Sequence, residues 1–391
     1  MTLPFVNSPP VIQLDGMPHA SLDATLLSLQ VEETLDGPAF CQARFLNWGP
    51  GEGQMDFLYF DRTKLNFGKK LNVLMPDVQG TGGIFSGRIS ALEALYPAGS
   101  HPEILVYAED QLQGMRTPRR TRLFHSISIP ELIQLIAAEH GLDVQAELHS
   151  SHASLPVIAQ FEQSDLAFVL ENARRASLDI WLIGDRLIMR DRRSAGDEIE
   201  LSYGQGLLSF QVRADLVDQL NSLSVTGWDM QTKQVVEASA GTSAIQNELD
   251  GRQGANKYLE SSAARHESLS SSLASDAQQA EALAETAFRQ RARRFISGFA
   301  IAQGNPNLRL GSHVHLQGLG PLFSGTYFIE KSRHIFDHQS GYRTELHVSR
   351  PGLELAHRSP RPAHKPKGKV QKRSPKAGPP SKKPGGRNLE A

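Results

Sequence analysis

One short phrase occurs twice in this chain of 391 residues, once near each end. Phe-Ser-Gly stands at residues 85–87 and again at 323–325, and taken alone it is a common strand–turn phrase. Each copy follows a segment with a central glycine, at 65–73 and at 308–316, and precedes an alternating strand. Self-similarity at this range is tested before any single motif, because it sets the architecture. The repeat predicts two related small β-barrels joined by different material.

The first predicted barrel occupies residues 1–114. Residues 27–33 alternate between apolar and polar side chains, as a half-buried strand does. The glycine-rich residues 80–83 predict a hairpin turn. A phosphate-binding loop is disfavoured there, because the Gly-Lys-Ser/Thr ending is missing and no helix follows.

Residues 115–199 change to a helical period and predict an α+β insert. One helix is expected to start near Pro130 and to end at Gly141, and a second to start at a cap near residues 164–165. A tight strand pair with its turn at residues 184–185 follows.

The second predicted barrel spans residues 200–350 and contains an excursion at 239–294. Residues 239–275 are rich in Ser, Ala and Gly with little periodicity, which predicts a long loop or a partly ordered excursion. A helix is expected from Asp276 to Arg294, and its basic end suits the helix dipole.

The net charge of −1 hides a division between body and tail. Residues 361–391 hold ten Lys/Arg and one acid, and subtracting these from the totals of 41 and 42 leaves a body of 31 basic and 41 acidic residues. Residues 351–391 mix Lys and Arg with Pro and Gly, so they are predicted to form a disordered basic tail.

Three sequence features constrain the expected cellular location of the chain. No run of about eighteen apolar residues exists, so no membrane span is expected. The first residues lack the basic and apolar regions of a secretory signal. Cys41 is the one cysteine, so an intrachain disulfide or a thiolate zinc site cannot form, and synthesis in the cytoplasm is expected.

The search for catalytic chemistry is negative. His313 and His315 share a strand face but no carboxylate cluster accompanies them, so a metal site is disfavoured. Cys41 fits a small buried side chain better than a nucleophile. The acids Glu131 and Asp165 sit at helix starts, where the dipole favours them. We therefore expect no cofactor, no metal, no small-molecule substrate and no enzymatic activity.

The run from residue 116 to 122 is basic. Nucleic-acid binding would require interleaved aromatic platforms, which are missing before Phe124, so a solvated linker or a docking surface for an acidic neighbour is favoured. Two alternatives stay open: a cell-wall-degrading tail enzyme with carboxylates not yet paired, and a nucleic-acid-binding protein that acts through its basic tail.

Two stretches resemble a known family. Residues 161–175 with Trp181 resemble a helix of tail-spike hub proteins. Residues 304–311, 314–316 and 323–327, with His334 and 341–344, resemble the closing barrel of the phage late control protein D family. That family is similar to the N-terminal part of VgrG spike proteins of type VI secretion and to contractile-phage baseplate hubs. The resemblance covers residues 1 to about 350.

The resemblance implies a function. Such hubs are homotrimers with two barrels in each chain, so the trimer presents a quasi-sixfold ring to a hexameric tail tube and a threefold face to a spike. This chain has about forty residues after Arg350 and departs from VgrG there, so a separately encoded spike is implied. Residues 177–179 replace a common glycine and leave the local turn in doubt. No residues carry a fused lysozyme activity.

These inferences predict a structural baseplate hub of a contractile tail or injection system. Its partners would be two further copies of itself, a spike, the tail-tube protein and other baseplate proteins, and it would be made in the bacterial cytoplasm and assembled into a phage-tail-like particle. The candidate interface elements are the barrel rims 68–72 and 311–316, the basic run 119–122 and the helix from Asp276 to Arg294. The candidate interface residues are Gly68, Phe85, Gly87, Arg119, Arg120, Arg122, Gly311, Phe323 and Gly325.

Overall fold

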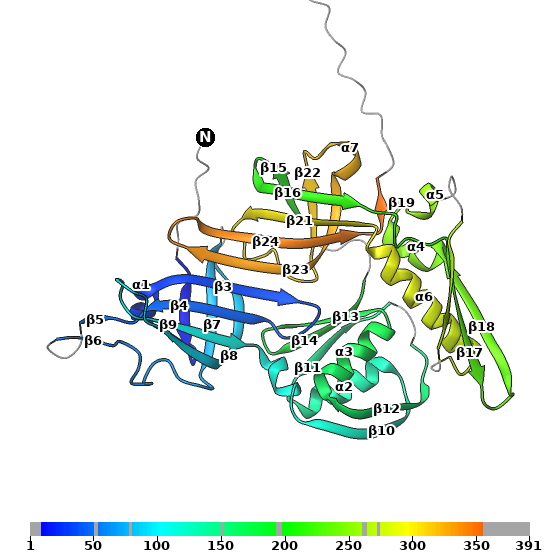
Figure 1. Ribbon diagram of the computed structural model, residues 1–391, viewed down its shortest axis with the longest axis horizontal. Coiled ribbons are helices and arrows are strands. Elements are labelled where there is room, and N and C mark those ends of the chain that lie inside the picture. The colour runs from blue at the N-terminus through cyan, green and yellow to red at the C-terminus, as the bar shows by residue number, and fades with distance from the viewer. Residues whose placement is uncertain are drawn as a thin grey trace, which may run out of the picture. The chain divides into compact units, whose positions relative to one another are not determined.

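The computed structural model describes residues 9–50, 54–77, 80–149, 152–192, 198–259, 264–271 and 274–354. Strands dominate this part of the chain, and the longer helices gather in an α+β insert and in an excursion from the second set of strands (Figure 1). The predicted class, mainly β with an α+β insert, is confirmed.

The first β unit lies within residues 9–110 and contains one short helix. Its elements are β1 (Val11–Leu14), β2 (Met17–Pro18), α1 (Ala20–Thr25), β3 (Leu26–Thr34), β4 (Phe40–Leu46), β5 (Gly49–Pro50), β6 (Met55–Asp56), β7 (Lys70–Asp77), β8 (Gly80–Leu95) and β9 (Glu103–Glu109). Its buried face, which includes Leu29, Val31 and Phe45, forms one apolar core.

The insert follows within residues 111–192. Its elements are η1 (Gln111–Met115), β10 (Arg119–Ile127), α2 (Ile129–Glu139), β11 (Asp143–Glu147), β12 (Leu155–Ser164), α3 (Asp165–Arg175), β13 (Leu178–Ile183) and β14 (Arg186–Asp191). Ser128 and Glu131 form a capping box around Pro130 at the start of α2, and Ser164 caps α3, as the sequence predicted.

The second β unit is assembled from two separate stretches of the chain. Its elements are β15 (Glu198–Tyr203), β16 (Gly206–Ala214), β21 (Ile296–Gln303), β22 (His313–Gln317), α7 (Gly320–Phe323), β23 (Gly325–Asp337) and β24 (Gly341–Arg350). The order β23-β22-β15-β16-β21-β24 closes through a β23–β24 pairing, so this unit is a closed six-stranded barrel.

The excursion leaves the second β unit after β16 and returns at β21. Its elements are β17 (Ser222–Asp229), β18 (Gln234–Gly241), η2 (Thr242–Ile245), α4 (Gln246–Leu249), β19 (Gln253–Gly254), α5 (Asn256–Leu259), β20 (His266–Ser270) and α6 (Ala277–Arg293). Of the two alternatives expected at 239–275, a long loop or a partly ordered excursion, the loop is wrong over the described residues, which are mostly in short elements. Helix α6 lies where the sequence predicted a helix, with Asp276 as its cap.

The two β units share five strands with identical registers. Each pairing of β3, β4, β7, β8 and β9 in the first unit matches a pairing of β16, β21, β22, β23 and β24 in the second. Ile89, for example, faces Ala108 as Ile329 faces Val348. The predicted relation between the two ends of the chain is thus visible residue by residue.

The irregularities of the strands match as well. A bulge separates Ile89 from Ala91 in β8, and the equivalent bulge separates Ile329 from Lys331 in β23. Another pair of bulges lies at residues 26–28 of β3 and 207–209 of β16. Bulges are specific features that bend a strand and fix its register, so matching bulges are strong evidence for one repeated unit.

The units differ in their remaining strand. In the first unit β1 runs antiparallel to β7. In the second unit β15 runs parallel to β22, and its last two residues pair with the first two of β16. Among the described residues no pairing of β1 with β3 closes the first unit. Among the described strands the first unit is therefore a seven-stranded sheet, in the order β2-β1-β7-β8-β9-β4-β3, around its own core.

The repeated phrase that first indicated the duplication does not coincide in the structure. Gly87 faces Leu71 in β7, and the residue of the second unit in that place is Tyr327, which faces Val314. Gly325 thus corresponds to Phe85, two residues out of step with the phrase. The alignment by Phe-Ser-Gly is wrong in register, although the two units are real.

The chain beyond β24 begins with a short strand. β25 (Gly352–Leu353) pairs with β19, so the first residues of the predicted tail belong to the folded part. The rest of the predicted basic tail, from residue 355, lies outside the described residues. No helix in the described part is long and apolar enough to cross a membrane.

Candidate functional site: assembly surfaces

The two β units meet edge to edge. β23 pairs antiparallel with β3 from Lys331 opposite Thr34 to Asp337 opposite Ser28, so one 13-stranded sheet runs through both units. On one face of this junction Glu32 forms ion pairs with Lys331 at 2.7 Å and with Arg333 at 3.3 Å. The junction shows how one β unit docks on the next.

An ion pair between the buried Glu33 and the half-buried Arg309 supports the junction. Glu33 of β3 is 3 % exposed, and its carboxylate accepts hydrogen bonds from Nε and Nη2 of Arg309 and from the backbone N–H of Leu310. Arg309 also donates to the carbonyl of Gly83 at 2.7 Å. We call Glu33 and Arg309 the junction pair, because they tie β3, β8 and the loop before β22 together.

The edge of β8 that corresponds to the β3-binding edge of β23 is unpaired in part. β7 pairs with this strand only as far as Arg88, and beyond the bulge the edge opposite β9 has no backbone partner among the described residues. Ala91, Glu93 and Ala94 are exposed, whereas the equivalent residues of β23 are covered by β3. This stretch of β8 is an unpaired edge.

β16, the strand of the second unit that corresponds to β3, also has an unpaired edge. β16 contacts β15 only at Gly206 and Leu207, so the edge of β16 opposite β21 has no strand partner over residues 209–214 in the described part of the chain. Arg213 lies here with a side chain that is 78 % exposed. β8 and β16 therefore each leave a stretch of edge unpaired among the described residues, one on the strand equivalent to β23 and the other on the strand equivalent to β3. The first unit also ends in an open edge at β1 and β2.

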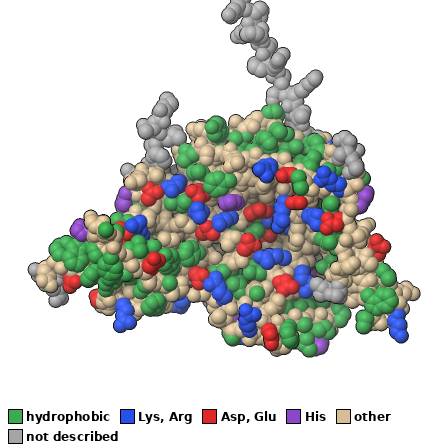
Figure 2. All heavy atoms as spheres, viewed as in Figure 1, with side chains coloured by type: hydrophobic (Ala, Val, Ile, Leu, Met, Phe, Trp, Pro, Cys, Tyr) green, Lys and Arg blue, Asp and Glu red, His purple; other side chains and the backbone are tan. Residues whose placement is uncertain are grey.

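An aromatic cluster adjoins the end of the β8 edge. The rings of Trp48, Phe57, Phe60 and Tyr96 contact one another at centroid distances from 4.8 to 6.4 Å. Tyr96 follows β8 directly and is 65 % exposed. Figure 2 shows hydrophobic side chains gathered on the part of the surface where Figure 1 places β5 and β6. Exposed apolar patches of this kind mark interaction surfaces.

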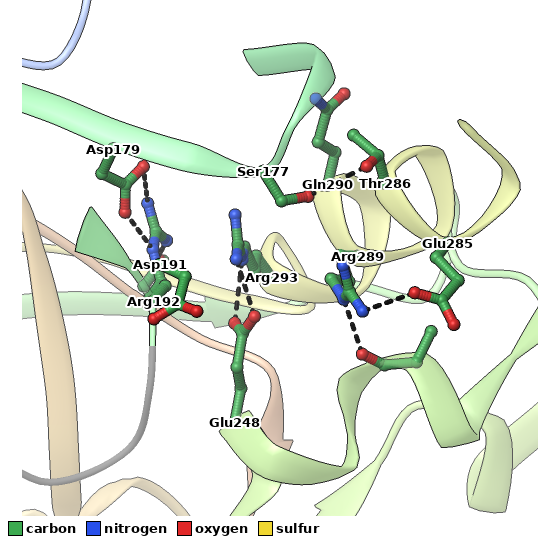
Figure 3. Close-up of polar contacts among 12 residues, drawn as sticks. Ser177, Asp179, Asp191, Arg192, Glu248, Glu285, Thr286, Arg289, Gln290 and Arg293 are labelled. Atoms are coloured by element: carbon green, nitrogen blue, oxygen red, sulfur yellow. Dashed lines mark hydrogen bonds and ion pairs between the residues drawn. The ribbon is translucent and has the colours of Figure 1, made fainter. Parts of the chain in front are cut away.

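A group of ion pairs lies where the insert, the excursion and the second β unit meet (Figure 3). Arg293 of α6 donates to both carboxylate oxygens of Glu248 in α4, at 2.8 and 2.7 Å, and both residues are 7 % exposed. Arg192, after β14, pairs with Asp179 at 2.9 Å and with Glu330 of the β23 bulge at 3.0 Å. We call these five residues the charged clamp.

Neutral contacts reinforce the clamp. Ser177 and Thr286 place their hydroxyl oxygens 3.3 Å apart, and the side chain of Gln290 donates to the carbonyl of Arg174. Arg289 donates to the carbonyl of Ala244 at 2.7 Å. A cavity of about 390 Å³ lies between α3, α4 and α6 at this point. These contacts fix α6 against the insert.

The basic run lies in strand β10 and is engaged within the insert. Arg122 donates to Asp165 at 2.6 Å and to Glu139 at 2.8 Å, and Arg120 donates to Glu139 at 2.8 Å. Burial would raise the pKa of Asp165, but hydrogen bonds from Gln160 and His140 and the two arginine charges outweigh it and lower the pKa. Arg119 is exposed and donates to the carbonyl of Glu162.

The four candidate residues of the repeated phrase differ in environment. Phe85 is 6 % exposed and belongs to the core of the first unit, and a side chain at Gly87 would overlap the carbonyl of Glu109. Phe323 ends α7 and is half-buried. Gly325 has a φ of +131° and lies against Arg350.

The two candidate turn glycines are equivalent. Gly68 donates its N–H to the carbonyl of Ile89, and Gly311 donates to Ile329, at 2.8 and 3.0 Å. Their φ angles are +77° and +78°, a region that only glycine adopts without strain. Gly68 lies two residues before β7 and Gly311 lies two residues before β22, as the matched sequence segments predicted.

Alanine at the two glycines is expected to have unequal effects. Gly68 has open space around it, so Gly68→Ala should lower the free energy of unfolding by about 1 kcal/mol, the cost of a left-handed non-glycine residue. A Cβ at Gly311 would overlap the indole of Trp181, so Gly311→Ala should cost about 3 kcal/mol. Urea denaturation of both variants measures the difference, and equal losses would contradict the packing described.

His334 is a buried neutral imidazole. It is 1 % exposed, its Nδ1 lies 2.8 Å from the hydroxyl of Tyr342, and its Nε2 lies 3.3 Å from the hydroxyl of Ser332. Ser332 donates its own proton to the carbonyl of Leu308, so Ser332 accepts from Nε2–H. Burial and the nearby charge of Arg309 lower the pKa of His334 to about 3.

This pKa predicts a pH-dependent stability. Between the ordinary histidine pKa of about 6.5 and the folded pKa of about 3, the unfolded chain binds a proton that folded His334 does not. The free energy of unfolding of the native protein relative to His334→Gln should therefore fall as pH drops below about 6.5, by up to about 1.4 kcal/mol per pH unit.

The comparison with the variant removes an opposing effect. Burial raises the pKa of Asp110 to about 7, so this carboxyl favours the folded state as pH falls from 7. Asp110 is present in both proteins and cancels from their difference. Guanidinium unfolding at pH 7 and at pH 5 makes the measurement, and a constant difference would contradict the buried neutral imidazole.

Metal and thiol chemistry find no support in the described residues. No group of three or more His, Cys, Asp or Glu side chains there could hold a metal ion. His315 contacts Thr326 at 3.0 Å and His313 packs on the ring of Phe328. Cys41 is fully buried, and burial raises the pKa of its thiol.

The fold is that of phage tail proteins. The 43 kDa tail protein of prophage MuSo2 from Shewanella oneidensis aligns with a TM-score of 0.65 at 11% identity, over 88% of this chain and 98% of that one. A tail protein from Neisseria meningitidis MC58 aligns with a TM-score of 0.63 at 13% identity, over 88% and 97%. This confirms the fold that the resemblance to tail hubs implied.

A secretion component shares the fold. An Escherichia coli component of the type VI secretion system, described as structurally similar to the T4 tail proteins gp27 and gp5, aligns with a TM-score of 0.56 at 11% identity, over 88% of this chain and 79% of that one. The chain belongs to the family described as the Alg8 N-terminal domain, whose model matches residues 19–337. No curated protein matches the chain in sequence.

Proposed function

We propose that this chain is a structural baseplate hub of a contractile tail or a related injection system. Three copies would form a ring of six β units that presents quasi-sixfold symmetry to the tail tube and threefold symmetry to a separately encoded spike. The late control protein D relation and the adaptor role belong to this proposal, as does assembly into a phage-tail-like particle after synthesis in the bacterial cytoplasm.

The observation that carries the proposal is the internal duplication with its edge-to-edge junction. Two β units with identical registers are already joined by β3 and β23, so one step of a ring is built into each chain. Each chain also leaves a stretch of edge unpaired on β8 and on β16 among the described residues. Surfaces that are not self-complementary join head to tail, and such contacts close into rings when the rotation permits.

The role is mechanical in this proposal. The buried charges of the clamp and the junction pair are matched with opposite charges, which serves rigidity rather than proton transfer. The exposed aromatic cluster and the two open edges supply contact surfaces. The basic run of β10, with its arginines held by Glu139 and Asp165, and helix α6 remain candidate surfaces toward other baseplate proteins.

Electron microscopy of the purified chain tests the proposal. Negatively stained particles should give end-on averages of a ring with six lobes, in which lobes carrying the insert alternate with lobes that do not. The alternation is expected because the insert and the excursion break the sixfold symmetry. Particles without a ring, or rings with another number of lobes, would contradict the hub.

A further inference from the structure

The two open strand edges fit one another. We infer that β8 of one copy pairs antiparallel with β16 of a second copy, in the register that β23 and β3 have within one chain. The inference rests on the proposed trimeric hub and adds the strands and residues through which the copies would join. Its basis is the equivalence of β8 with β23 and of β16 with β3.

The register follows from the matched strands. Residue numbers in β8 and β23 differ by 240, since Ile89 and Ile329 occupy the same place, and numbers in β3 and β16 differ by 181, since Val31 and Val212 do. Transferring the β3–β23 partners in this way gives the pairs between copies. They are Ala214 with Leu92, Arg213 with Glu93, Val212 with Ala94, and Gln211 with Leu95.

The transferred register places opposite charges together. Within the chain Glu32 faces Arg333, and between copies Arg213 would face Glu93. The acid lies on β3 and the base on β23 within the chain, whereas between copies the base would lie on β16 and the acid on β8. Both arrangements place opposite charges across from each other. The hydroxyl of Tyr107 donates to Glu93 at 2.6 Å and holds its carboxylate. Opposite charges directly across an antiparallel pair stabilise it, and like charges destabilise it.

One uncharged pair is preserved as well. Gln30 faces Ile335 in the junction, and Gln211 would face Leu95 between copies. A register moved by one residue would turn every side chain to the opposite face, so agreement at both positions supports this register.

The other face of the interface is apolar on both sides. In the junction this face is buried: its residues are Leu29, Val31, Glu33, Ser332, His334 and Phe336, each 3 % exposed or less. Between copies the equivalent residues are Phe210, Val212, Ala214, Leu92, Ala94 and Tyr96. Ala94, Ala214 and Tyr96 are exposed in one chain alone. Tyr96 extends this face into the aromatic cluster.

An open edge of this composition requires a partner. Natural proteins protect free edges with lysine, proline or inward-pointing charges, because unpaired N–H and C=O groups recruit other strands. Residues 91–95 carry no lysine, proline or inward-pointing charge; the bulge at Ser90 precedes them, Glu93 is their one charge, and the face that alternates with Glu93 is apolar. Addition of a strand to such an edge gains main-chain hydrogen bonds, and the side-chain pairs give specificity.

Charge reversal tests the ion pair. Arg213→Glu and Glu93→Arg should each raise the dissociation constant of the assembly at least tenfold, because like charges then face each other. The double variant Arg213→Glu/Glu93→Arg should restore assembly. Lys233→Glu changes an exposed lysine in the β17–β18 turn and is the matched control, expected to assemble like the native chain. Light scattering across a concentration series reports all four.

Cysteine pairs test the register. Arg213→Cys combined with Glu93→Cys should form disulfides between copies under mild oxidation, because directly opposite residues bring their Cβ atoms within reach. Cys41 is fully buried and does not compete. Arg213→Cys combined with Ala91→Cys is shifted by two residues and should link poorly. Denaturing electrophoresis shows covalent dimers and trimers.

The outcomes separate this inference from the proposed function. A native trimer with efficient 213–93 linkage and rescue by the double variant supports both. If the native chain is a trimer but the 213–93 cysteine pair forms few disulfides, or the charge reversals leave the dissociation constant unchanged, the strand pairing is wrong. The proposed hub function is then unaffected. A native chain that stays monomeric at every concentration contradicts the hub and the pairing together.

Discussion

Glu33→Ala is expected to lower the free energy of unfolding by about 3–5 kcal/mol. The change removes the carboxylate that faces two guanidinium nitrogens of Arg309 and the N–H of Leu310, and it leaves the half-buried guanidinium of Arg309 without a counter-charge. Breaking one side of a buried pair costs more than the pair contributes, because the remaining charge loses its solvation. Since the pair ties both β units together, they should lose cooperativity.

Glu32→Ala is the matched control for this prediction. The neighbouring carboxylate also forms ion pairs across the junction, with Lys331 and Arg333, but it is partly exposed. Pairs near the surface contribute about 0.2–1 kcal/mol, so the loss should be small. Guanidinium unfolding followed by tryptophan fluorescence measures both variants. Equal losses of unfolding free energy in Glu33→Ala and Glu32→Ala would show that the junction pair stabilises the fold no more than an exposed ion pair does.

Arg293→Ala is expected to destabilise the fold by about 3–5 kcal/mol. It leaves the carboxylate of Glu248, which is 7 % exposed, without its two charge-assisted hydrogen bonds. The double variant Glu248→Leu/Arg293→Met removes both charges and keeps most of the volume, so it should cost clearly less than the single variant. This non-additivity identifies direct coupling.

The measurement is again an unfolding free energy, obtained for the single and the double variants. Arg289→Ala is a useful comparison, because Arg289 lies one turn earlier on α6, pairs with a partly exposed Glu285 and should cost about 1 kcal/mol or less. A double variant as unstable as the sum of its singles would show that Glu248 of α4 and Arg293 of α6 are not coupled.

Local sequence patterns predicted the duplication of the β unit and the positions of the helices, because both depend on short-range signals. The glycines at 68 and 311 occupy positions that need a positive φ, so the sequence marks them directly. The caps at Ser128 and Ser164 act within one helical turn. Such signals lie within a few residues, and sequence reasoning finds them reliably.

The register of the repeat could not be read from the same signals. The connection between β7 and β8 differs in length from that between β22 and β23, which contains α7. The phrase Phe-Ser-Gly therefore falls at different depths in the two units. The bulges at Ser90 and Glu330 fix the true alignment, and they depend on strand pairing rather than on any residue type.

The charged networks were missed for another reason. Glu33 lies on the buried side of an alternating strand, in phase with Leu29 and Val31, and a carboxylate at such a position signals a hidden partner. Its partner, Arg309, is 276 residues away and cannot be identified from sequence. Arg122 likewise meets Asp165 only through folding of the insert. A loop was expected at 239–275 because the strands and helices of that stretch are short and rich in Ser and Ala.

Light scattering of the purified native chain tests the central claim most directly. The account predicts a stable species at three times the 43.0 kDa chain mass, persisting as the protein is diluted. In the proposed ring of six β units each chain supplies two, so the ring contains three copies. A monomer at every concentration, or a stable dimer, would contradict the ring.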